Sequence, residues 1–110
     1  MKGRIEVRRS PLGGCGVFAT DSIRAGDRVG WYIGKRTATN GRHVCWIKFD
    51  DGWRGYQGRG HLRFLNHADR PNSEFYGLDL YAIRLIRQGD EVTIDYGNEY
   101  EWDDQRSMAV

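Results

Sequence analysis

Closely spaced glycines restrict how this chain can fold more than any other feature of its sequence. The 110 residues include 15 glycines and only 2 prolines, and the glycines are spread along the whole length. Glycine adopts left-handed turn conformations that other residues avoid, and it interrupts long helices. Since no stretch keeps its apolar residues at a helical period, the pattern predicts a mostly β fold of short strands and tight turns, with little helix.

Strand candidates are short runs that alternate apolar with polar residues or are rich in β-branched and aromatic ones. They cover residues 4–8, 28–33, 44–49, 80–86 and 91–96, with a further apolar run at 17–19. Turns are predicted at 22–26, at 50–52 as a hairpin, and at 87–90. Elsewhere we expect polar turns over 35–42, a loop or a bent edge strand over 53–60, and a turn or two of helix within 58–65.

Composition limits the size of the protein's core and the classes of partner. With 39% apolar and 13% aromatic residues, the chain can bury one small core, so a single domain over residues 1–110 is expected, ending in a polar tail at 103–110. The 17 basic and 15 acidic residues leave a formal net charge of +2, which does not favour nucleic acid as a direct ligand. The N-terminus does not resemble a signal peptide, and no apolar run approaches the roughly 18 residues of a membrane span, so the expectation is a soluble intracellular protein with no membrane partner.

The cysteines and histidines do not form a recognisable metal-binding pattern. Two cysteines, Cys15 and Cys45, cannot make a four-cysteine zinc site, and they are too few for a disulfide framework. A mixed site with the three histidines is arithmetically possible, but the sequence lacks paired ligand spacings such as CxxC or HxxxH. No metal is therefore expected.

A Gly-x-Gly sequence, Gly14-Cys15-Gly16, lies between two strand candidates, just after Ser10-Pro11. Glycines there let the backbone approach a ligand closely, and its N–H and C=O groups can hold the charged ends of an amino-acid moiety. A dinucleotide fingerprint would need GxGxxG at the start of a helix, which is absent. By itself the sequence is weak evidence for a site, since glycine-rich turns in β proteins more often bind nothing.

Two later segments are dense in polar and aromatic groups. The first is Arg63-Phe64-Leu65-Asn66-His67-Ala68-Asp69-Arg70-Pro71-Asn72, which is either a ligand-binding loop or an Asn/Asp-rich turn capped by its own side chains. The second is Gly89-Asp90-Glu91-Val92-Thr93-Ile94-Asp95-Tyr96-Gly97, with further aromatics at Tyr100 and Trp102. Taken alone, Tyr96 could simply be a half-buried strand residue.

In this order and spacing, the three segments resemble the SET domain family of protein lysine methyltransferases. The family's opening G-x-G and Val-Phe-Ala-like strand match residues 14–19, and its strand with a tyrosine and a glycine matches 29–34. Its R-F-[IL]-N-H-S-x-x-P-N stretch matches 63–72, and its final G-[ED]-E-[LVI]-T-x-D-Y-G matches 89–97. The resemblance covers about residues 4–102, nearly the whole chain.

The resemblance implies a SET-domain fold of several small sheets, in which the last strand threads under a loop as a C-terminal pseudoknot and so brings the second and third segments side by side. It also implies S-adenosylmethionine as the cofactor, with Tyr96 as the catalytic residue. The cofactor-binding residues that it implies are Gly14, Cys15, Gly16, Arg63, Asn66, His67, Tyr100 and Trp102. The implied lining of the channel for the substrate lysine is Tyr32, Ile94, Tyr96 and Tyr100.

Methyl transfer explains why such a site would be aromatic. The attacking lysine must be neutral, yet with a reference pKa near 10.4 only about one part in a thousand is neutral at pH 7.4, a cost of roughly 4 kcal/mol. A narrow aromatic channel strips water from the ammonium and so favours the neutral amine. A carboxylate base is not required, so Glu91 and Asp95 are expected to be structural.

Several departures from the family pattern bear on substrate and product. The usual Ser-Cys after Asn-His is Ala68-Asp69, and the acidic residue usual before Tyr32 is Trp31. The cysteine-rich tail that some members use to bind zinc has no counterpart within residues 1–110. Ile94 replaces the common Phe or Tyr, which leaves the number of methyl groups open. The insert that selects substrate in larger members is reduced to about residues 36–59; if its Trp46 and Trp53 are exposed, a homodimer is expected to bury them.

Three functions are compatible with these residues. The first is transfer of methyl groups to a lysine of a protein or peptide, such as a histone tail or a cytosolic protein. The second is a catalytically inactive SET-like module that binds cofactor or peptide. The third, a small β-barrel that binds nucleic acid, would need its arginines and tryptophans on one face. The location would be cytoplasmic, or nuclear on chromatin if the substrate is a histone.

Overall fold

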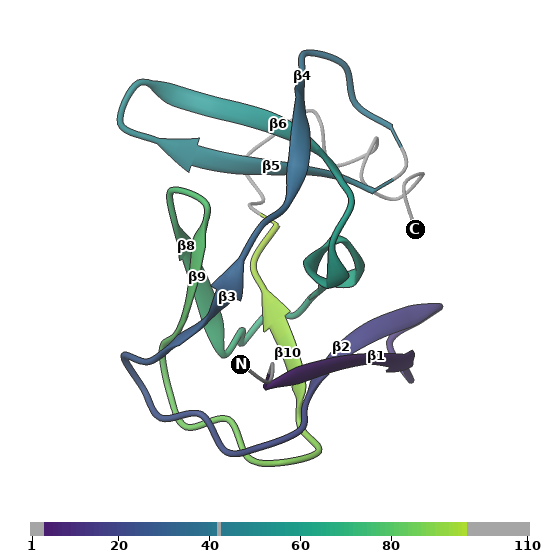
Figure 1. The fold of residues 1–110 in the computed structure, drawn as a ribbon, viewed down its shortest axis with the longest axis vertical. Coiled ribbons are helices and arrows are strands. Elements are labelled where there is room, and N and C mark those ends of the chain that lie inside the picture. Colours follow the sequence, from purple (N-terminus) through teal and green to yellow (C-terminus); the bar gives the residue numbers. More distant parts are fainter. Residues whose placement is uncertain (1–3, 42, 97–110) are drawn as a thin grey trace.

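Ten short strands and one turn of 3-10 helix make up the described part of this computed structural model, residues 4–41 and 43–96 (Figure 1). The strands form three small sheets of four, three and three strands. The predicted mostly β class is therefore confirmed, and the 3-10 turn, η1 (His61–Phe64), lies within the segment predicted to be helical.

The four-stranded sheet brings together the beginning, middle and end of the described chain. Its order is β1 (Ile5–Arg9), β2 (Cys15–Ala19), β10 (Glu91–Ile94) and β7 (Asn66–His67). β10 pairs antiparallel with β2 and parallel with β7, opposing Val92 to Val17 and Thr93 to Asn66. The second and third motif segments therefore lie side by side, as the family resemblance implied.

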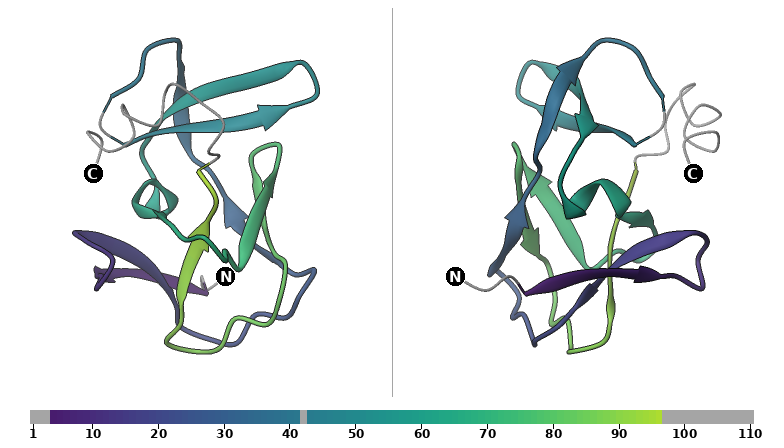
Figure 2. Two further views of the ribbon diagram at one scale, coloured as in Figure 1. Left: turned by 180° about the vertical axis from the view of Figure 1, so that it is seen from behind. Right: turned by 45° about the vertical axis from the view of Figure 1, so that its right-hand side comes forward.

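The two three-stranded sheets complete the fold. One has the order β3 (Arg28–Trp31), β9 (Asp79–Ala82), β8 (Ser73–Tyr76), and the other has the order β4 (Gly34–Thr37), β6 (Gly52–Gly58), β5 (Val44–Phe49). In Figures 1 and 2 the β4-β6-β5 sheet is at the opposite end of the molecule from β1 and β2, and η1 lies between them. η1 contacts β1, β2 and β6, so it joins the two ends.

A single apolar cluster lies between the sheets. Its most buried side chains come from alternate positions of the strands and from the turns that connect them: Val17, Ile23, Ile47, Leu80, Ile86 and Val92. Ile23 and Ile86 join two turns through an isolated β-bridge. Because a small chain has few residues to bury, even these two turns each contribute one large aliphatic group to the core.

Several predictions of secondary structure were wrong. Residues 53–60 were expected to be a loop or an edge strand, but β6 is the central strand of its sheet and pairs with both β4 and β5. The reason is packing: Gly55 lies so close to the ring of Trp46 and the backbone of Thr37 that a Cβ would overlap them. β4 forms where polar turns were expected, β8 had no predicted counterpart, and the strand expected over 80–86 ends at Ala82.

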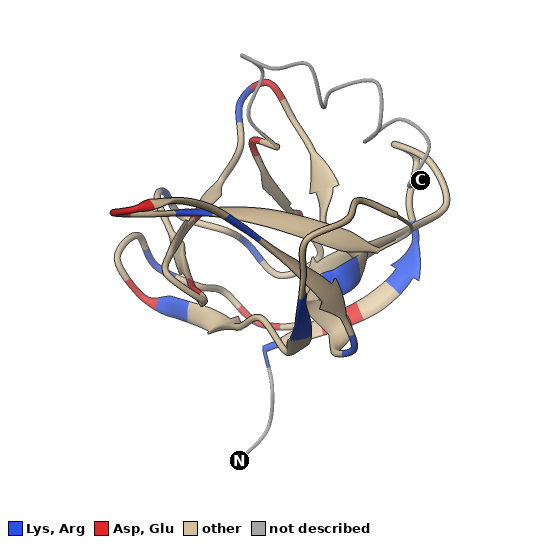
Figure 3. Ribbon diagram, turned by 90° about the horizontal axis from the view of Figure 1, so that it is seen from above, with Lys and Arg blue, Asp and Glu red and all other residues tan. Residues whose placement is uncertain are grey.

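Charged residues are dispersed over the molecule. Figure 3 shows Lys and Arg positions interspersed with Asp and Glu positions around the ribbon. Surface pairs include Arg28 with Asp79 at 3.2 Å and Arg54 with Asp51 at 3.1 Å. The one-sided basic face that the nucleic-acid hypothesis requires is not seen among the described residues. Nor is there, among those residues, a helix long and apolar enough to cross a membrane.

Candidate functional site

Asn66 is the residue at which all three motif segments meet. It occupies the first position of β7, and its Nδ2 donates to the carbonyl oxygen of Cys15 at 3.0 Å and to Oε2 of Glu91 at 2.8 Å. Cys15 belongs to the Gly-x-Gly sequence and Glu91 begins β10. The side chain therefore ties the first turn of the fold to its last described strand.

The turn before β2 is shaped by its glycines and by Ser10. Gly13 and Gly14 have φ of 126° and 54°, a region that favours glycine, and the turn is closed by a hydrogen bond from Ser10 N to Gly14 O at 2.8 Å. Gly16 is needed for a different reason, since a Cβ there would overlap the carboxylate of Glu91. The second glycine of the Gly-x-Gly thus allows β10 to approach the turn closely.

Glu91 is the centre of a hydrogen-bond chain. Its Oε1 accepts from the Ser10 hydroxyl at 2.7 Å, its Oε2 accepts from Asn66, and its backbone carbonyl accepts from Asn72 Nδ2 at 2.8 Å. Ser10 in turn accepts from Leu12 N at 2.9 Å. Glu91 was expected to be structural, and these contacts show which groups it holds.

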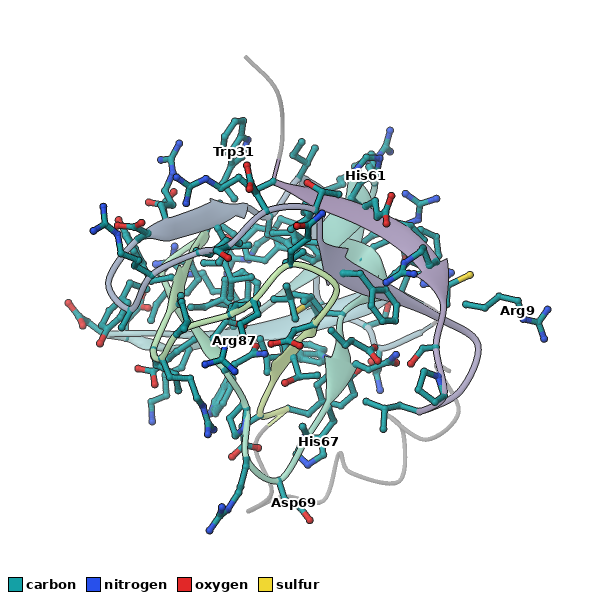
Figure 4. The ribbon with its side chains drawn as sticks, turned by 90° about the horizontal axis from the view of Figure 1, so that it is seen from below. Arg9, Trp31, His61, His67, Asp69 and Arg87 are labelled. Atoms are coloured by element: carbon teal, nitrogen blue, oxygen red, sulfur yellow. The ribbon has the colours of Figure 1, made fainter. Side chains whose placement is uncertain are left out.

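His67 holds the backbone of Tyr96. Its Nδ1 accepts from Tyr96 N at 3.0 Å, so in the neutral ring the proton lies on Nε2, which faces Asp69 Oδ1 at 3.3 Å. Since Nδ1 uses its lone pair in this way, its 3.7 Å distance to Asp95 is not an ion pair. Figure 4 shows His67 and Asp69 together on one side of the molecule, away from Trp31 and His61.

The hydroxyl of Tyr96 has a fixed donor direction. It donates to the carbonyl oxygen of Leu65 at 2.6 Å, and its ring lies 5.4 Å from that of His67. A phenol has one proton, and a carbonyl can only accept it, so the hydroxyl can approach a further polar group only as an acceptor. This is the orientation that an amine donor would require.

Tyr32 is near enough to Tyr96 for the two phenols to interact electrostatically. It is 3% exposed, and its hydroxyl donates to the carbonyl oxygen of His43 at 3.3 Å. Burial raises the pKa of Tyr32 far above its usual value, with the nearby Cys45 and Tyr96 adding to the rise and Arg63 opposing it. Tyr32 and Ile94 both belong to the buried cluster against which Tyr96 packs.

Arg63 is engaged with its own helical turn. Its Nη1 donates to the carbonyl oxygens of Arg59 at 2.9 Å and Gly60 at 3.1 Å, and its guanidinium lies over the ring of Phe64. It was predicted to line the cofactor site together with Asn66 and His67. It also lies near enough to Tyr32 for its charge to oppose the rise in the pKa of that phenol.

The loop between β7 and β8 wraps around β10. Asn72 Oδ1 accepts from Thr93 N at 2.9 Å while its Nδ2 donates to Glu91 O, and the buried Ser73 hydroxyl donates to Thr93 O at 2.7 Å. On the other side, Ala68 N donates to Ile94 O at 3.1 Å. β10 is therefore held by side chains and backbone of the second motif together with Ser73, the first residue of β8.

Some predicted site residues have no structural test here. Tyr100 and Trp102, expected to cover the cofactor or the lysine stem, lie outside the described residues, and so does Gly97 of the final motif. Among residues 4–41 and 43–96 there is no group of three or more His, Cys, Asp or Glu side chains that could hold a metal ion.

Sequence reasoning missed groups whose roles depend on long-range contacts. The carbonyl of Leu65 receives the Tyr96 hydroxyl, but a backbone group leaves no trace in the sequence. Ser10 and Asn72 belong to the quoted motifs, yet no role was predicted for either. Their positions beside a proline were the only local signal.

Comparison with known proteins gives a family match over most of the chain. The model of the SET domain family matches residues 14–97. Among curated proteins, trithorax of Drosophila melanogaster, a histone-lysine N-methyltransferase, is 31% identical over 126 residues, covering 91% of this chain and 3% of that protein. The H3 lysine-4 specific histone-lysine N-methyltransferase of Aspergillus oryzae is 28% identical over 126 residues, covering 93% of this chain and 10% of that protein. The chain thus spans a tenth or less of the length of these relatives.

Solved structures with the same fold are more distant in sequence. A candidate histone methyltransferase of Plasmodium falciparum aligns with a TM-score of 0.67 and 21% identity over 94% of this chain and all (100%) of that chain. The methyltransferase domain of human PR domain-containing protein 2 aligns with a TM-score of 0.63 and 18% identity over 91% of this chain and 82% of that chain. These two likenesses establish a common fold.

Proposed function

This chain belongs to the SET domain family, and from that premise we propose that it transfers methyl groups from S-adenosylmethionine to a lysine side chain of a protein substrate. The observation that carries the proposal is the meeting of the three motif segments at Asn66, next to the Tyr96–His67 pair. Residues that resemble a methyltransferase motif in sequence are also held together by hydrogen bonds in space.

The residues present fit the methionine end of S-adenosylmethionine. Gly13 and Gly14 keep an open turn at positive φ, and Cys15 beside them is exposed, so backbone groups are accessible there. Asn66 donates both of its amide hydrogens within the protein, and no described residue donates to its Oδ1. An acceptor oxygen of this kind suits the cationic α-amino group of the cofactor. Gly14, Cys15, Gly16, Asn66 and His67 are therefore proposed to hold that end, and Arg63, Tyr100 and Trp102 remain proposed cofactor contacts.

The proposed mechanism depends on delivering a neutral lysine. S-adenosylmethionine supplies a methyl group on a cationic sulfur, so the protein must align an uncharged amine and exclude water. The surroundings of Tyr32 support this: burial that raises the pKa of a phenol lowers the pKa of an amine, because both shifts disfavour the charged form. Tyr32, Ile94 and Tyr96 are the described side chains proposed to line the lysine channel.

Tyr96 is proposed to orient the lysine amine. Because its hydroxyl proton is given to Leu65, the phenolic oxygen accepts from the amine and leaves the nitrogen lone pair directed at the methyl group. His67 fixes the backbone from which that ring extends. No side chain of this set has to remove the lysine proton, which can leave to water.

The substrate is proposed to be a histone tail or another lysine-bearing protein. The named curated relatives are histone-lysine methyltransferases, which favours a histone and hence a nuclear, chromatin-bound location. A cytosolic protein substrate would place the enzyme in the cytoplasm. Trp31, 54% exposed where the family usually has an acidic residue, is expected to alter how the substrate backbone binds.

A homodimer is also proposed, but only one of the two tryptophans that were expected to support it is exposed. Trp46 is half-buried and its Nε1 donates to Asn40 Oδ1 at 3.0 Å, so it needs no partner subunit to cover it. Trp53 is 37% exposed, with Lys48 over its ring at 5.6 Å. Only Trp53 of this pair therefore favours a second copy.

The deciding experiment is methyl transfer from isotopically labelled S-adenosylmethionine to histones and to a cell extract, with mass spectrometry of the labelled acceptor. Label on a lysine is expected. If calorimetry shows binding of S-adenosylmethionine but neither acceptor set is labelled, the inactive cofactor-binding module becomes the better description. If the protein neither binds the cofactor nor transfers label, the proposed function is wrong.

A further inference from the structure

We propose that Glu91 is a positioning residue that sets the affinity of the site for the α-amino group of the cofactor, because it fixes which atom of Asn66 faces the ligand. The inference rests on the proposed function, and it assigns a task to a carboxylate that takes no part in methyl transfer.

The first step is the orientation of the Asn66 amide. Nδ2 lies within hydrogen-bond distance of two groups, the Cys15 carbonyl oxygen at 3.0 Å and Glu91 Oε2 at 2.8 Å. Both groups can only accept, so the nitrogen must face them, and neither contact survives if the amide is flipped. The opposite atom, Oδ1, is then directed away from this pair in a single defined orientation.

The second step is that Glu91 itself is held rigidly. Its other oxygen accepts from the Ser10 hydroxyl at 2.7 Å, and its backbone carbonyl is bound by Asn72 at 2.8 Å. The carboxylate also lies against the Cα of Gly16, where any larger residue would overlap it. A carboxylate that is bound by Ser10 and packed against Gly16, on a backbone held by Asn72, loses little further entropy when it binds Asn66.

The third step is the consequence for a cationic ligand. An amide carbonyl held in one orientation binds an ammonium group better than an amide that rotates. The reason is that the side chain has already lost its rotational entropy when the protein folded, so it loses little more on binding. The bond between Glu91 and Asn66 is charge-assisted, so removing it leaves only the Cys15 carbonyl to hold Nδ2 and allows the amide to turn its Nδ2 toward the ligand more often. A donor facing an ammonium group repels it.

The test compares two ligands that differ only in the α-amino group, namely S-adenosylhomocysteine and its deamino analogue, by titration calorimetry. Glu91→Ala is expected to weaken S-adenosylhomocysteine about tenfold, the effect of one charge-assisted hydrogen bond, and to leave the analogue unchanged. Glu91→Gln should retain most of the affinity, because its Oε1 can still accept from Asn66 while its Nε2 donates to Ser10. If Glu91→Ala does not fold, Glu91→Met fills the space without a good acceptor.

Two controls separate positioning from other effects. Asp90→Asn removes a neighbouring charge on a side chain that binds Arg87 N at 2.9 Å and not Asn66, and it should change neither affinity. In an Asn66→Ala background, Glu91→Ala should have no further effect on S-adenosylhomocysteine binding, since the pair then acts as one unit.

Three results would overturn the inference alone: equal weakening of both ligands, equal weakening by Glu91→Gln and Glu91→Ala, or an undiminished effect of Glu91→Ala in the Asn66→Ala background. By contrast, a parent protein that binds neither S-adenosylmethionine nor S-adenosylhomocysteine would overturn the proposed function, and the role of Glu91 with it.

Discussion

At the scale of single residues, Tyr96 combines the most constraints. Its N–H is bound by His67, its hydroxyl by the Leu65 carbonyl, and its ring packs on the buried cluster. Side chain and backbone are thus oriented by different partners. Such double anchoring is what a precisely placed amine acceptor needs, since errors of about 1 Å in alignment can cost about 100-fold in rate.

Tyr96→Phe separates the hydroxyl from the ring. The ring contacts and the backbone bond to His67 remain, so the free energy of unfolding should fall by only about 1 kcal/mol, the worth of one hydrogen bond. Turnover should fall about 100-fold or more, because the amine loses its acceptor. Label transfer and a urea titration measure the two effects; turnover equal to that of the parent protein would remove Tyr96 from its proposed role.

Stability should fall in alkaline solution because the fold raises the pKa of two weak acids, Cys45 and Tyr32. Burial raises the pKa of Cys45 from 9.0 to about 12, and the pKa of Tyr32 rises from 10.0 in the same direction. Above pH 9 the unfolded chain loses its Cys45 proton while the folded chain keeps it. The contribution of Cys45 to the free energy of unfolding is therefore complete below pH 9 and is lost as the pH rises toward about 12.

Melting temperatures recorded between about pH 8 and pH 11 test this prediction. Each such group lowers the free energy of unfolding by up to about 1.4 kcal/mol for each pH unit in this range. Cys45→Ala should make the decline shallower, whereas Cys15→Ala, which removes an exposed thiol, should not. A decline of the same slope in parent and Cys45→Ala proteins would contradict the prediction.

Residue identities were largely predictable, but their partners were not. The motifs predicted that Asn66, His67, Tyr96 and the Gly-x-Gly share one site, and hydrogen bonds do join Asn66 to Cys15 and His67 to Tyr96. The bonds to Leu65 O and from Ser10 could not be predicted, since they depend on how distant segments meet. The bonds from the Arg63 guanidinium to the carbonyls of its own turn could not be predicted either, because the motif does not show which backbone groups lie within reach.

At the scale of elements, β10 has the central place. It pairs with β2 on one edge and β7 on the other, and Asn72 and Ser73 bind its backbone as well. Its location in the sequence was predicted nearly to the residue because its apolar residues alternate. By contrast, β6 was not recognised as a central strand: three glycines within residues 53–60 weaken a strand pattern in general, but here Gly55 makes room for the Trp46 ring.

Asn72→Ala should loosen β10. The change leaves Thr93 N–H and Glu91 C=O without their side-chain partner, and the free energy of unfolding should fall by about 2 kcal/mol. Asn72→Asp is the matched variant, because it still accepts from Thr93 N–H, and it should lose about half as much. Urea unfolding of the three proteins is the measurement, and an unchanged midpoint for Asn72→Ala would show that the loop does not stabilise the strand.

At the scale of the whole molecule, the surface carries mixed charge and several exposed aromatic residues. Trp31, Trp53 and Tyr76 are 54%, 37% and 63% exposed. Scattered singly such residues need no explanation, but several on a small chain favour association. Neither oligomeric state nor substrate could be predicted from the motifs, because both depend on surfaces outside them.

Light scattering over a range of concentrations tests the homodimer. The mass is expected to rise from near 12.7 kDa toward twice that value as concentration increases. Trp53→Lys should shift that rise to higher concentration, because it places a charge where apolar surface would be buried. A mass that stays near 12.7 kDa at every concentration would exclude the dimer.

The position of β10 late in the sequence also determines when the candidate site can form during synthesis of the chain. During synthesis, residues 14–16 and 66–67 emerge well before residue 91. Until Glu91 has emerged, Asn66 lacks the carboxylate that orients it, and β2 lacks its pairing with β10. Sheets closed by such distant pairings form slowly compared with helical folds. A nascent chain stopped before Glu91 would therefore hold every glycine of the first turn and the Asn-His pair without a formed site, so the proposed cofactor binding would report that β10 has been inserted.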